Sequence, residues 1–260
     1  MKLKYKSISI LFATLMSCPT LASVNQAEII KGTDVGAQDW IAHSVVALIS
    51  SNEQSQALCT ASIVAQDLAI TAAHCVTSDA PDLQSTLTLI FSRDIHGASP
   101  ANFRKIDRVE VPAEWNPMGS GQKDTSDVAV VHFSGGLPAG YAPSNLLPFN
   151  QPLSQGQAVV LAGYGITNAT ADTGAGVLRK TTVVISDPNY SISEVELDQT
   201  HGGGACHGDS GGPAYVIING HPYLFGITSR GGGNCDEDVI YTKISAYQDW
   251  FARAVAAIRK

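Results

Sequence analysis

Three residues that lie far apart along the chain could together perform nucleophilic catalysis: His74, Asp127 and Ser210. A serine hydroxyl is a weak nucleophile at neutral pH, and an imidazole that titrates near pH 6.5 can remove its proton. A buried carboxylate can fix the tautomer of that imidazole and stabilise its protonated form. Each residue alone is common in a structural role. Together they predict acyl transfer through a serine nucleophile.

The sequence around the serine is the most specific part of this pattern. Ser210 lies in Gly208-Asp209-Ser210-Gly211-Gly212-Pro213. Glycines let the backbone turn tightly and let a substrate carbonyl approach peptide N–H groups. A glycine-rich turn is the simpler interpretation of this segment alone. The catalytic interpretation therefore depends on His74, which follows an apolar segment, and on Asp127, which begins another.

The elements that must position these residues are mostly strands. Short apolar segments rich in β-branched residues recur between turn signals, and we expect strands at Ser44–Ile49, Ala61–Ile70, Leu87–Phe91, Val128–Phe133, Ala158–Leu161, Thr181–Ile185, Ala214–Ile218, Leu224–Thr228 and Val239–Ile244. Helical periodicity is clear only at the C-terminus, where Ser245 could cap a helix. The proline-rich segment Leu137–Pro152 is the best candidate for a crossing between two β halves. This pattern predicts an all-β sandwich or a pair of barrels.

Composition excludes several other classes. The chain has 260 residues, of which 44% are hydrophobic and 15% charged, so it has enough apolar material for a core of its own. The formal net charge is −7 and the sequence has no basic stripe, which argues against a nucleic-acid partner. Beyond the N-terminal region, no apolar stretch approaches the ~20 residues of a membrane-spanning helix.

The N-terminal segment has the pattern of an export signal. Residues 1–22 combine early lysines, an apolar stretch from Ile8 to Met16 and small residues ending at Ala22, which predicts a secretory signal peptide. The rival interpretation is a lipoprotein signal that acylates Cys18. We favour cleavage after Ala22, and so a secreted or periplasmic protein.

Four cysteines remain after the signal peptide is removed: Cys59, Cys75, Cys206 and Cys235. An even set in an exported chain indicates disulfides, and four cysteines allow three pairings. No Cys-x2-Cys pair is present, so the spacing does not fit a zinc site. His201 and His207 flank a glycine run without a carboxylate or thiolate at matching spacing. We therefore expect no metal and no organic cofactor.

The order His, Asp, Ser with a Gly-x-Ser-Gly-Gly turn resembles the chymotrypsin/trypsin family of serine endopeptidases. The resemblance extends from Ile29 to the C-terminus and includes Gly163-Tyr164-Gly165, Ser229 with Gly231, and Tyr241-Thr242-Lys243. It implies two six-stranded antiparallel β-barrels, approximately residues 29–140 and 141–244, followed by a C-terminal α-helix over 245–260.

The resemblance also assigns roles to individual residues. His74 would be the general base, Asp127 its orienting acid and Ser210 the nucleophile, with the amides of Gly208 and Ser210 as the oxyanion hole. Ser229 would hydrogen-bond the aspartate from behind. Disulfides would join Cys59 to Cys75 and Cys206 to Cys235. We expect a monomer that acts on polypeptide substrates.

Activation by cleavage is a further expectation from the resemblance. Residues 23–28 would be a propeptide, and the Ile29 ammonium released by cleavage would pair with Asp209 inside the protein. A buried charge needs such a partner. Glu28 and Lys31 depart from the family's usual basic residue and glycine, so we expect a separate activating protease that accepts Glu.

The specificity pocket would be lined by Gly204, Ala205, Gly231 and Val239, with His207 near its entrance. Gly204 stands where trypsin-like members have aspartate, so we expect preference for small or medium apolar side chains before the scissile bond. The alternative is a shift of one residue that puts Asp238 at the pocket base and favours Lys or Arg.

Arg230 stands where the family usually has tryptophan on the subsite wall, which could favour acidic groups upstream of the bond. A catalytically silent protease-fold binding protein is the competing functional class.

Overall fold

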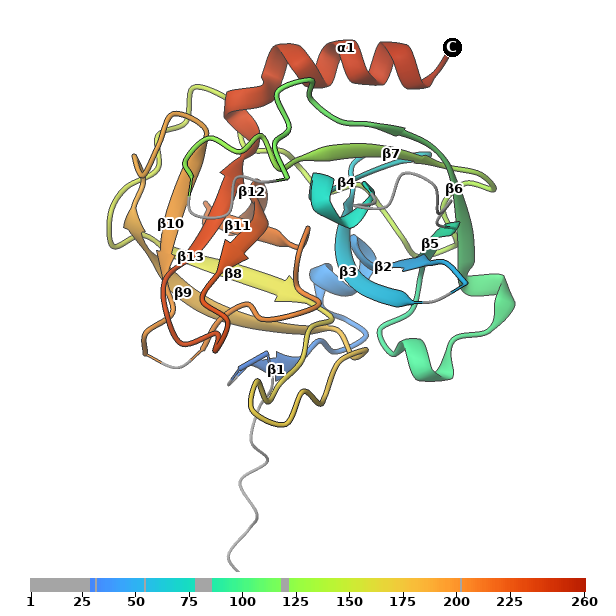
Figure 1. Cartoon of the computed structure of the whole chain (residues 1–260), viewed down its shortest axis with the longest axis horizontal. Coiled ribbons are helices and arrows are strands. Elements are labelled where there is room, and N and C mark those ends of the chain that lie inside the picture. Colours follow the sequence, from blue (N-terminus) through green and yellow to red (C-terminus); the bar gives the residue numbers. More distant parts are fainter. Residues whose placement is uncertain (1–28, 31, 54, 78–85, 118–121, 202) are drawn as a thin grey trace, which may run out of the picture.

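The structure is a computed structural model of the chain (Figure 1) and describes residues 29–30, 32–53, 55–77, 86–117, 122–201 and 203–260. The expected signal peptide 1–22, the expected propeptide 23–28 and Lys31 lie outside the described residues. The predicted signal peptidase site, the lipoprotein alternative at Cys18 and the activation bond therefore stay predictions.

The first barrel consists of six antiparallel strands: β2 Val45–Ser51, β3 Gln56–Ile63, β4 Leu68–Thr71, β5 Thr86–Ile90, β6 Phe103–Glu110 and β7 Ala129–Phe133. They close in the order β2-β3-β4-β7-β6-β5. The apolar, β-branched content of these segments suits a pleated surface that is buried on its inner face. The four residues that begin β2 are all buried, as is the whole of β4.

The second barrel is formed by β8 Ala158–Gly163, β9 Arg179–Asp187, β10 Glu194–Asp198, β11 Pro213–Ile218, β12 His221–Gly231 and β13 Val239–Lys243. Their order is β9-β10-β13-β12-β11-β8, and pairing of β8 with β9 closes the barrel. The predicted fold of two six-stranded antiparallel barrels is confirmed.

The two ends of the chain cross to the opposite barrel. The short β1, Thr33–Asp34, pairs with β9 of the second barrel, whereas the C-terminal helix α1, Gln248–Ile258, packs on β6 and β7 of the first. The segment between β7 and β8 also links the barrels, because Ala142 N donates to His43 O and Leu147 N donates to Leu224 O. The predicted crossing at 137–152 is therefore present.

Several predicted bounds are wrong. The expected strand 61–70 is two strands with a turn between them, and β6 and β10 were not predicted. Ser245 does not cap the helix: residues Ile244–Tyr247 form a 3-10 turn that buries Ile244, and α1 begins only at Gln248. The other 3-10 turns of the described residues are Trp40–His43, Ala73–Cys75, Ile95–Gly97 and Pro100–Asn102.

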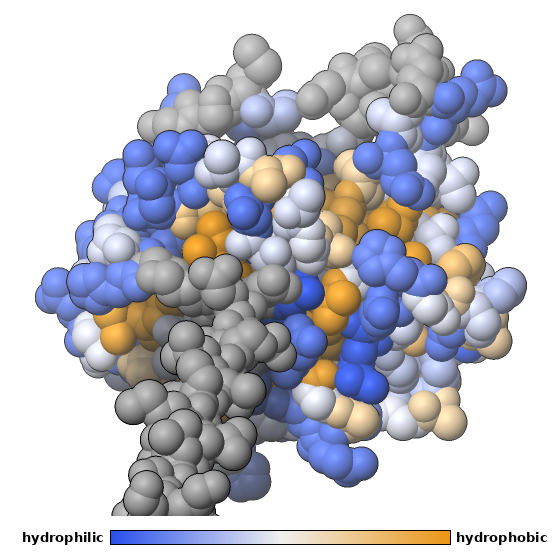
Figure 2. Space-filling model, turned by 90° about the horizontal axis from the view of Figure 1, so that it is seen from below, coloured by the Kyte–Doolittle hydropathy of each residue, from blue (hydrophilic) through white to orange (hydrophobic). Residues whose placement is uncertain are grey.

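Most of the apolar material is inside the barrels. Figure 2 shows one face, on which hydrophobic residues gather in limited areas among hydrophilic ones. The large hydrophobic residues that are exposed within the described ranges are Phe103, Phe149, Val184, Ile192 and Ile217. None of the helices in the described part of the chain has the length and apolar character needed to cross a membrane.

Candidate active site

His74 lies in the 3-10 turn Ala73–Cys75 that follows β4. Its backbone N–H donates to Asp127 Oδ1 at 3.0 Å, and its Nδ1 lies 2.8 Å from Asp127 Oδ2. The side chain of His74 is 35% exposed, whereas that of Asp127 is 4% exposed. The buried carboxylate thus fixes the ring with Nδ1 as donor and leaves Nε2 as acceptor.

Asp127 lies two residues before β7 and is held by residues of the second barrel. The hydroxyl of Ser229 on β12 donates to Asp127 Oδ2 at 2.7 Å, and Thr242 Oγ1 on β13 donates to the Asp127 carbonyl oxygen at 2.9 Å. The carboxylate accepts three hydrogen bonds, two from His74 and one from Ser229, and these fix its orientation. Ser229 occupies the place that the sequence predicted for it.

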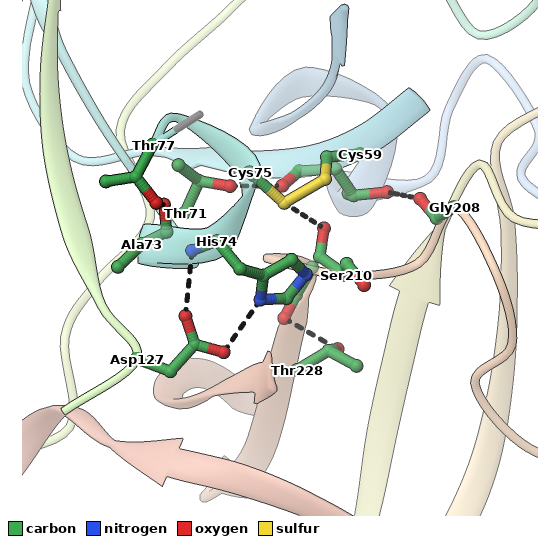
Figure 3. Close-up of a disulfide and its surroundings, with 12 residues drawn as sticks. Cys59, Thr71, Ala73, His74, Cys75, Thr77, Asp127, Gly208, Ser210 and Thr228 are labelled. Carbon is green, nitrogen blue, oxygen red and sulfur yellow. Dashed lines mark hydrogen bonds and ion pairs between the residues drawn. A yellow bond between two sulfur atoms is a disulfide. The ribbon is translucent and has the colours of Figure 1, made fainter. Parts of the chain in front are cut away.

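Ser210 comes from the second barrel and is fastened to the first. Thr60 on β3 donates its backbone N–H to Ser210 O at 2.8 Å and its hydroxyl to Gly208 O at 3.0 Å. The sulfur of Cys75 lies 3.6 Å from Ser210 O. In Figure 3 the imidazole of His74 lies between the carboxylate of Asp127 and the side chain of Ser210. The structure thus brings together all three residues singled out from the sequence.

The glycines around Ser210 are required by the backbone and by close packing. Gly208 and Gly211 have φ of +97° and +78°, a region that residues with a Cβ rarely adopt. A Cβ at Gly212 would lie 2.7 Å from the carbonyl oxygens of Ala162 and Asp209. In the described part of the chain, the amides of Gly208 and Ser210 donate to no protein acceptor. Both are available to an oxygen atom of a ligand.

The side chain of Asp209, next to Ser210, is buried. Its carboxylate accepts from the amides of Gly165 and Cys206, each at 2.8 Å. A Cβ at Gly163 or Gly165 would collide with this carboxylate, which explains the Gly-Tyr-Gly motif. Burial raises the pKa of Asp209 from 3.8 to about 6, although the two amides oppose that shift.

A cavity of about 200 Å³ opens beside Ser210. Its lining includes six of the predicted pocket residues: Ala205, His207, Ser229, Arg230, Gly231 and Val239. The pairing of Gly231 with Val239 on neighbouring strands puts the valine side chain into the wall.

Two expected pocket residues lie elsewhere. Gly204 does not line the cavity, because the buried side chain of Gln199 packs against it and hydrogen-bonds the backbone of Ala205. Gln199 was not recognised from the sequence. Asp238, the alternative base of the pocket, is half-buried and also absent from the lining. The strand register brings Val239, not Asp238, to the wall.

The guanidinium of Arg230 is bound to another residue that the sequence analysis missed. It forms a bidentate ion pair with Glu194 on β10, at 2.7 and 2.9 Å. The charge of Arg230 is therefore already compensated within the protein. The alternation of charged and apolar residues in Glu194–Asp198 was the available signal for β10, but nothing in the sequence identified the ion pair.

Both expected disulfides are present. Cys59 is bonded to Cys75 and Cys206 to Cys235. Two groups in the described ranges bring a histidine close to these sulfurs, but the sulfurs are in disulfides and offer no thiolate to a metal. Because Cys75 adjoins His74, the first disulfide fixes the histidine turn to β3.

Comparison with known proteins agrees with this geometry. At the sequence level, the chain is 24% identical to chymotrypsin-like elastase family member 1 of Homo sapiens, over 89% of this chain and 93% of the relative. It is 26% identical to a chymotrypsin of Phaedon cochleariae, with 87% and 84% covered, and 29% identical to trypsin-1 of Astacus astacus, with 74% and 85% covered.

The solved structure of HL collagenase has a similar fold. It superposes with a TM-score of 0.71 at 20% identity, covering 87% of this chain and 98% of that chain. The family model described as Trypsin matches residues 29–251. This match spans both barrels and the first turn of α1, and we conclude that the chain belongs to the trypsin family.

Proposed function

We propose that the chain is an exported serine endopeptidase that hydrolyses peptide bonds through an acyl-enzyme on Ser210. The observation that carries the proposal is the hydrogen bond between His74 Nδ1 and the Asp127 carboxylate, with the imidazole facing Ser210. Membership of the trypsin family, with relatives named as chymotrypsin, elastase and trypsin, supports this activity.

The chemistry assigns one task to each residue. His74 Nε2 accepts the proton of the Ser210 hydroxyl while the serine oxygen attacks the substrate carbonyl carbon. The amides of Gly208 and Ser210 donate to the oxyanion, and each such donor is worth about 3–4 kcal/mol in the transition state. His74 then gives the proton to the leaving amine. Water hydrolyses the ester by the same steps in reverse.

Activation by cleavage before Ile29 is the second part of the proposal. The side chain of Ile29 is buried, and Ile30 O accepts from Gly204 N at 3.2 Å, so this segment packs beside the pocket. Asp209 is a buried carboxylate whose contacts are neutral amides. An ammonium at Ile29 would be its counter-ion and would keep the adjoining amides of the oxyanion hole aligned.

The third part concerns specificity. We propose a preference for small or medium apolar side chains at the residue before the scissile bond, because Val239 and Ala205 line the cavity and Asp238 does not. The substitution Val239→Asp should introduce cleavage after Lys and Arg. A peptide-library profile of the two processed proteins measures the difference. Cleavage by the unsubstituted protein only after Lys or Arg would contradict the preference.

Labelling with a fluorophosphonate tests the catalytic proposal. The precursor is cleaved before Ile29 with an added protease, and the reagent is applied to the wild type and to Ser210→Ala. We expect a stoichiometric adduct on Ser210 of the processed wild type, none on the alanine variant and slow labelling of the precursor. An unreactive Ser210 in processed protein would support the silent binding protein instead.

A further inference from the structure

Glu194 is the first residue of β10 and is completely buried. Its carboxylate accepts two hydrogen bonds from the Arg230 guanidinium, at 2.7 and 2.9 Å, and two weaker ones from the backbone N–H and hydroxyl of Thr125, at 3.3 and 3.2 Å. A buried ion pair of this kind is costly to desolvate, and its geometry is satisfied only when all partners are in place. Glu194 therefore fixes the position of Thr125.

Thr125 belongs to the segment that leads into Asp127. Residues 122–128 form neither helix nor strand, and Asp124 and Ser126 have φ of +57° and +59°. Non-glycine residues adopt such angles only where their surroundings impose them. The local backbone therefore does not determine where Asp127 points, and contacts from outside the segment must do so.

Arg230 supplies one of these contacts directly and another through Glu194. Its guanidinium donates to the carbonyl oxygen of Gln122 at 2.7 Å, so the ion pair fastens the segment at Gln122 and at Thr125. Arg230 is also the neighbour of Ser229, whose hydroxyl donates to Asp127 at 2.7 Å. The same ion pair thus touches both stretches of chain that hold the Asp127 carboxylate.

The pair is charged under the conditions in which a serine nucleophile works. Burial raises the pKa of Glu194, but the hydrogen bonds and charge of Arg230, together with backbone hydrogen bonds from Asp124 and Thr125, outweigh that effect and the net pKa is lowered. Both partners are therefore ionised near neutral pH.

We propose that Arg230 and Glu194 are positioning residues, which fasten segment 122–126 and thereby hold the Asp127 carboxylate against the imidazole of His74. The inference rests on the proposed function of the triad. Neither residue takes part in bond making; they act through Thr125, Gln122 and Ser229. The competing role is a subsite wall, because Arg230 also lines the cavity beside Ser210.

The test compares Glu194→Gln with wild type in the processed enzyme. One measurement is the rate of Ser210 labelling by a small fluorophosphonate, which needs no peptide subsite. The other is kcat and KM for a tetrapeptide amide across pH. We expect the labelling rate and kcat to fall together, about 10- to 100-fold, with KM changed less than about threefold. The acid limb of the kcat/KM profile should move to lower pH, because a displaced carboxylate stabilises the protonated imidazole less.

Two further variants exclude a merely structural effect. Glu196→Gln, on the same strand and bonded to Ser186, should leave labelling unchanged. The double variant Glu194→Met with Arg230→Met removes both charges, so its melting temperature should recover relative to Glu194→Gln while its labelling rate stays low. If labelling recovers together with the melting temperature, the role is structural and the proposal is overturned.

A change confined to KM for the tetrapeptide, with normal labelling, would make the pair a subsite wall and would also overturn the proposal. Failure of the proposed function is a distinct result, because processed wild type would then show no labelling of Ser210 at all.

Discussion

Glu194 and Asp209 are both buried carboxylates of the C-terminal half, but they differ in what compensates their charge. Glu194 contacts the Arg230 guanidinium, and its pKa is lowered. Asp209 accepts only from backbone amides among the described residues, and burial raises its pKa to about 6. Glu194 thus carries a permanent counter-ion, the guanidinium of Arg230. The charge of Arg179 is the smallest of the causes that lower the pKa of Asp209, and the proposed cleavage before Ile29 would place an ammonium beside this carboxylate.

The largest effect should come from removing the charge of Asp209 in processed enzyme. Under the proposed activation, Asp209→Asn would leave the Ile29 ammonium without an anion, and the amides of Gly208 and Ser210 would lose their alignment. We expect kcat/KM to fall about 10³-fold or more, measured with a tetrapeptide amide. Asp236→Asn, an equal charge change at an exposed position nearby, is the control. Full activity of the Asp209 variant would show that Asp209 does not serve as the counter-ion of the Ile29 ammonium, and so would remove the contrast with Glu194.

The unprocessed precursor should show the cost of the uncompensated charge as a pH dependence of stability. Asp209 has a folded pKa of about 6 and an ordinary value of 3.8. The folded state therefore holds a proton that the unfolded state releases between these values, and stability falls as pH rises from 4 to 7. The difference corresponds to on the order of 3 kcal/mol.

Urea unfolding of the precursor measures this difference, with Ser210→Ala as the background to prevent autolysis and Asp209→Asn as the reference. In processed protein the Ile29 ammonium should remove the dependence. Identical pH profiles for precursor and processed protein would show that no counter-ion is added.

Glu194 should give the opposite pH dependence of stability. Its pKa is lowered below 4.5, so its contribution is complete above that value and is lost as pH falls through the folded pKa. Glu194→Gln should cost about 2 kcal/mol at neutral pH, since hydrogen bonds to charged groups contribute that much. Urea unfolding in the Ser210→Ala background checks both points. A variant as stable as its parent at pH 7 but less stable at pH 4 would contradict them.

The residues of this site that belong to a short contiguous motif could be predicted from the sequence. Those that depend on partners distant in the chain could not. Ser210 and its glycines were recognisable because they form one short contiguous motif in which two glycines have positive φ, although the contacts that exclude a Cβ at Gly211 and Gly212 come largely from distant parts of the chain. The strands of the barrels were mostly recognisable from apolar runs. Strand β6 was not, because charged residues interrupt it and its pairing with β7 has an irregular register.

The residues that hold the catalytic and pocket residues in place were harder to predict. Glu194 is 36 residues before Arg230, and Gln199 holds the backbone of the pocket residue Ala205 through hydrogen bonds that only the folded chain creates. A charged residue at the start of a strand usually faces solvent, so sequence alone favoured an exposed glutamate. The structure instead buries it, because an arginine from a neighbouring element meets it in the interior.

The smallest change in stability should come from Asp124, an exposed residue of segment 122–126. Its carboxylate accepts from the hydroxyls of Ser191 and Ser193, and it has a left-handed φ of +57°. Asparagine tolerates this conformation and retains an acceptor oxygen. We therefore expect Asp124→Asn to change the free energy of unfolding by less than about 0.5 kcal/mol, measured in urea beside Glu194→Gln. A loss as large as that of Glu194→Gln would mean that Asp124 holds segment 122–126 as strongly as the buried pair of Arg230 and Glu194 does.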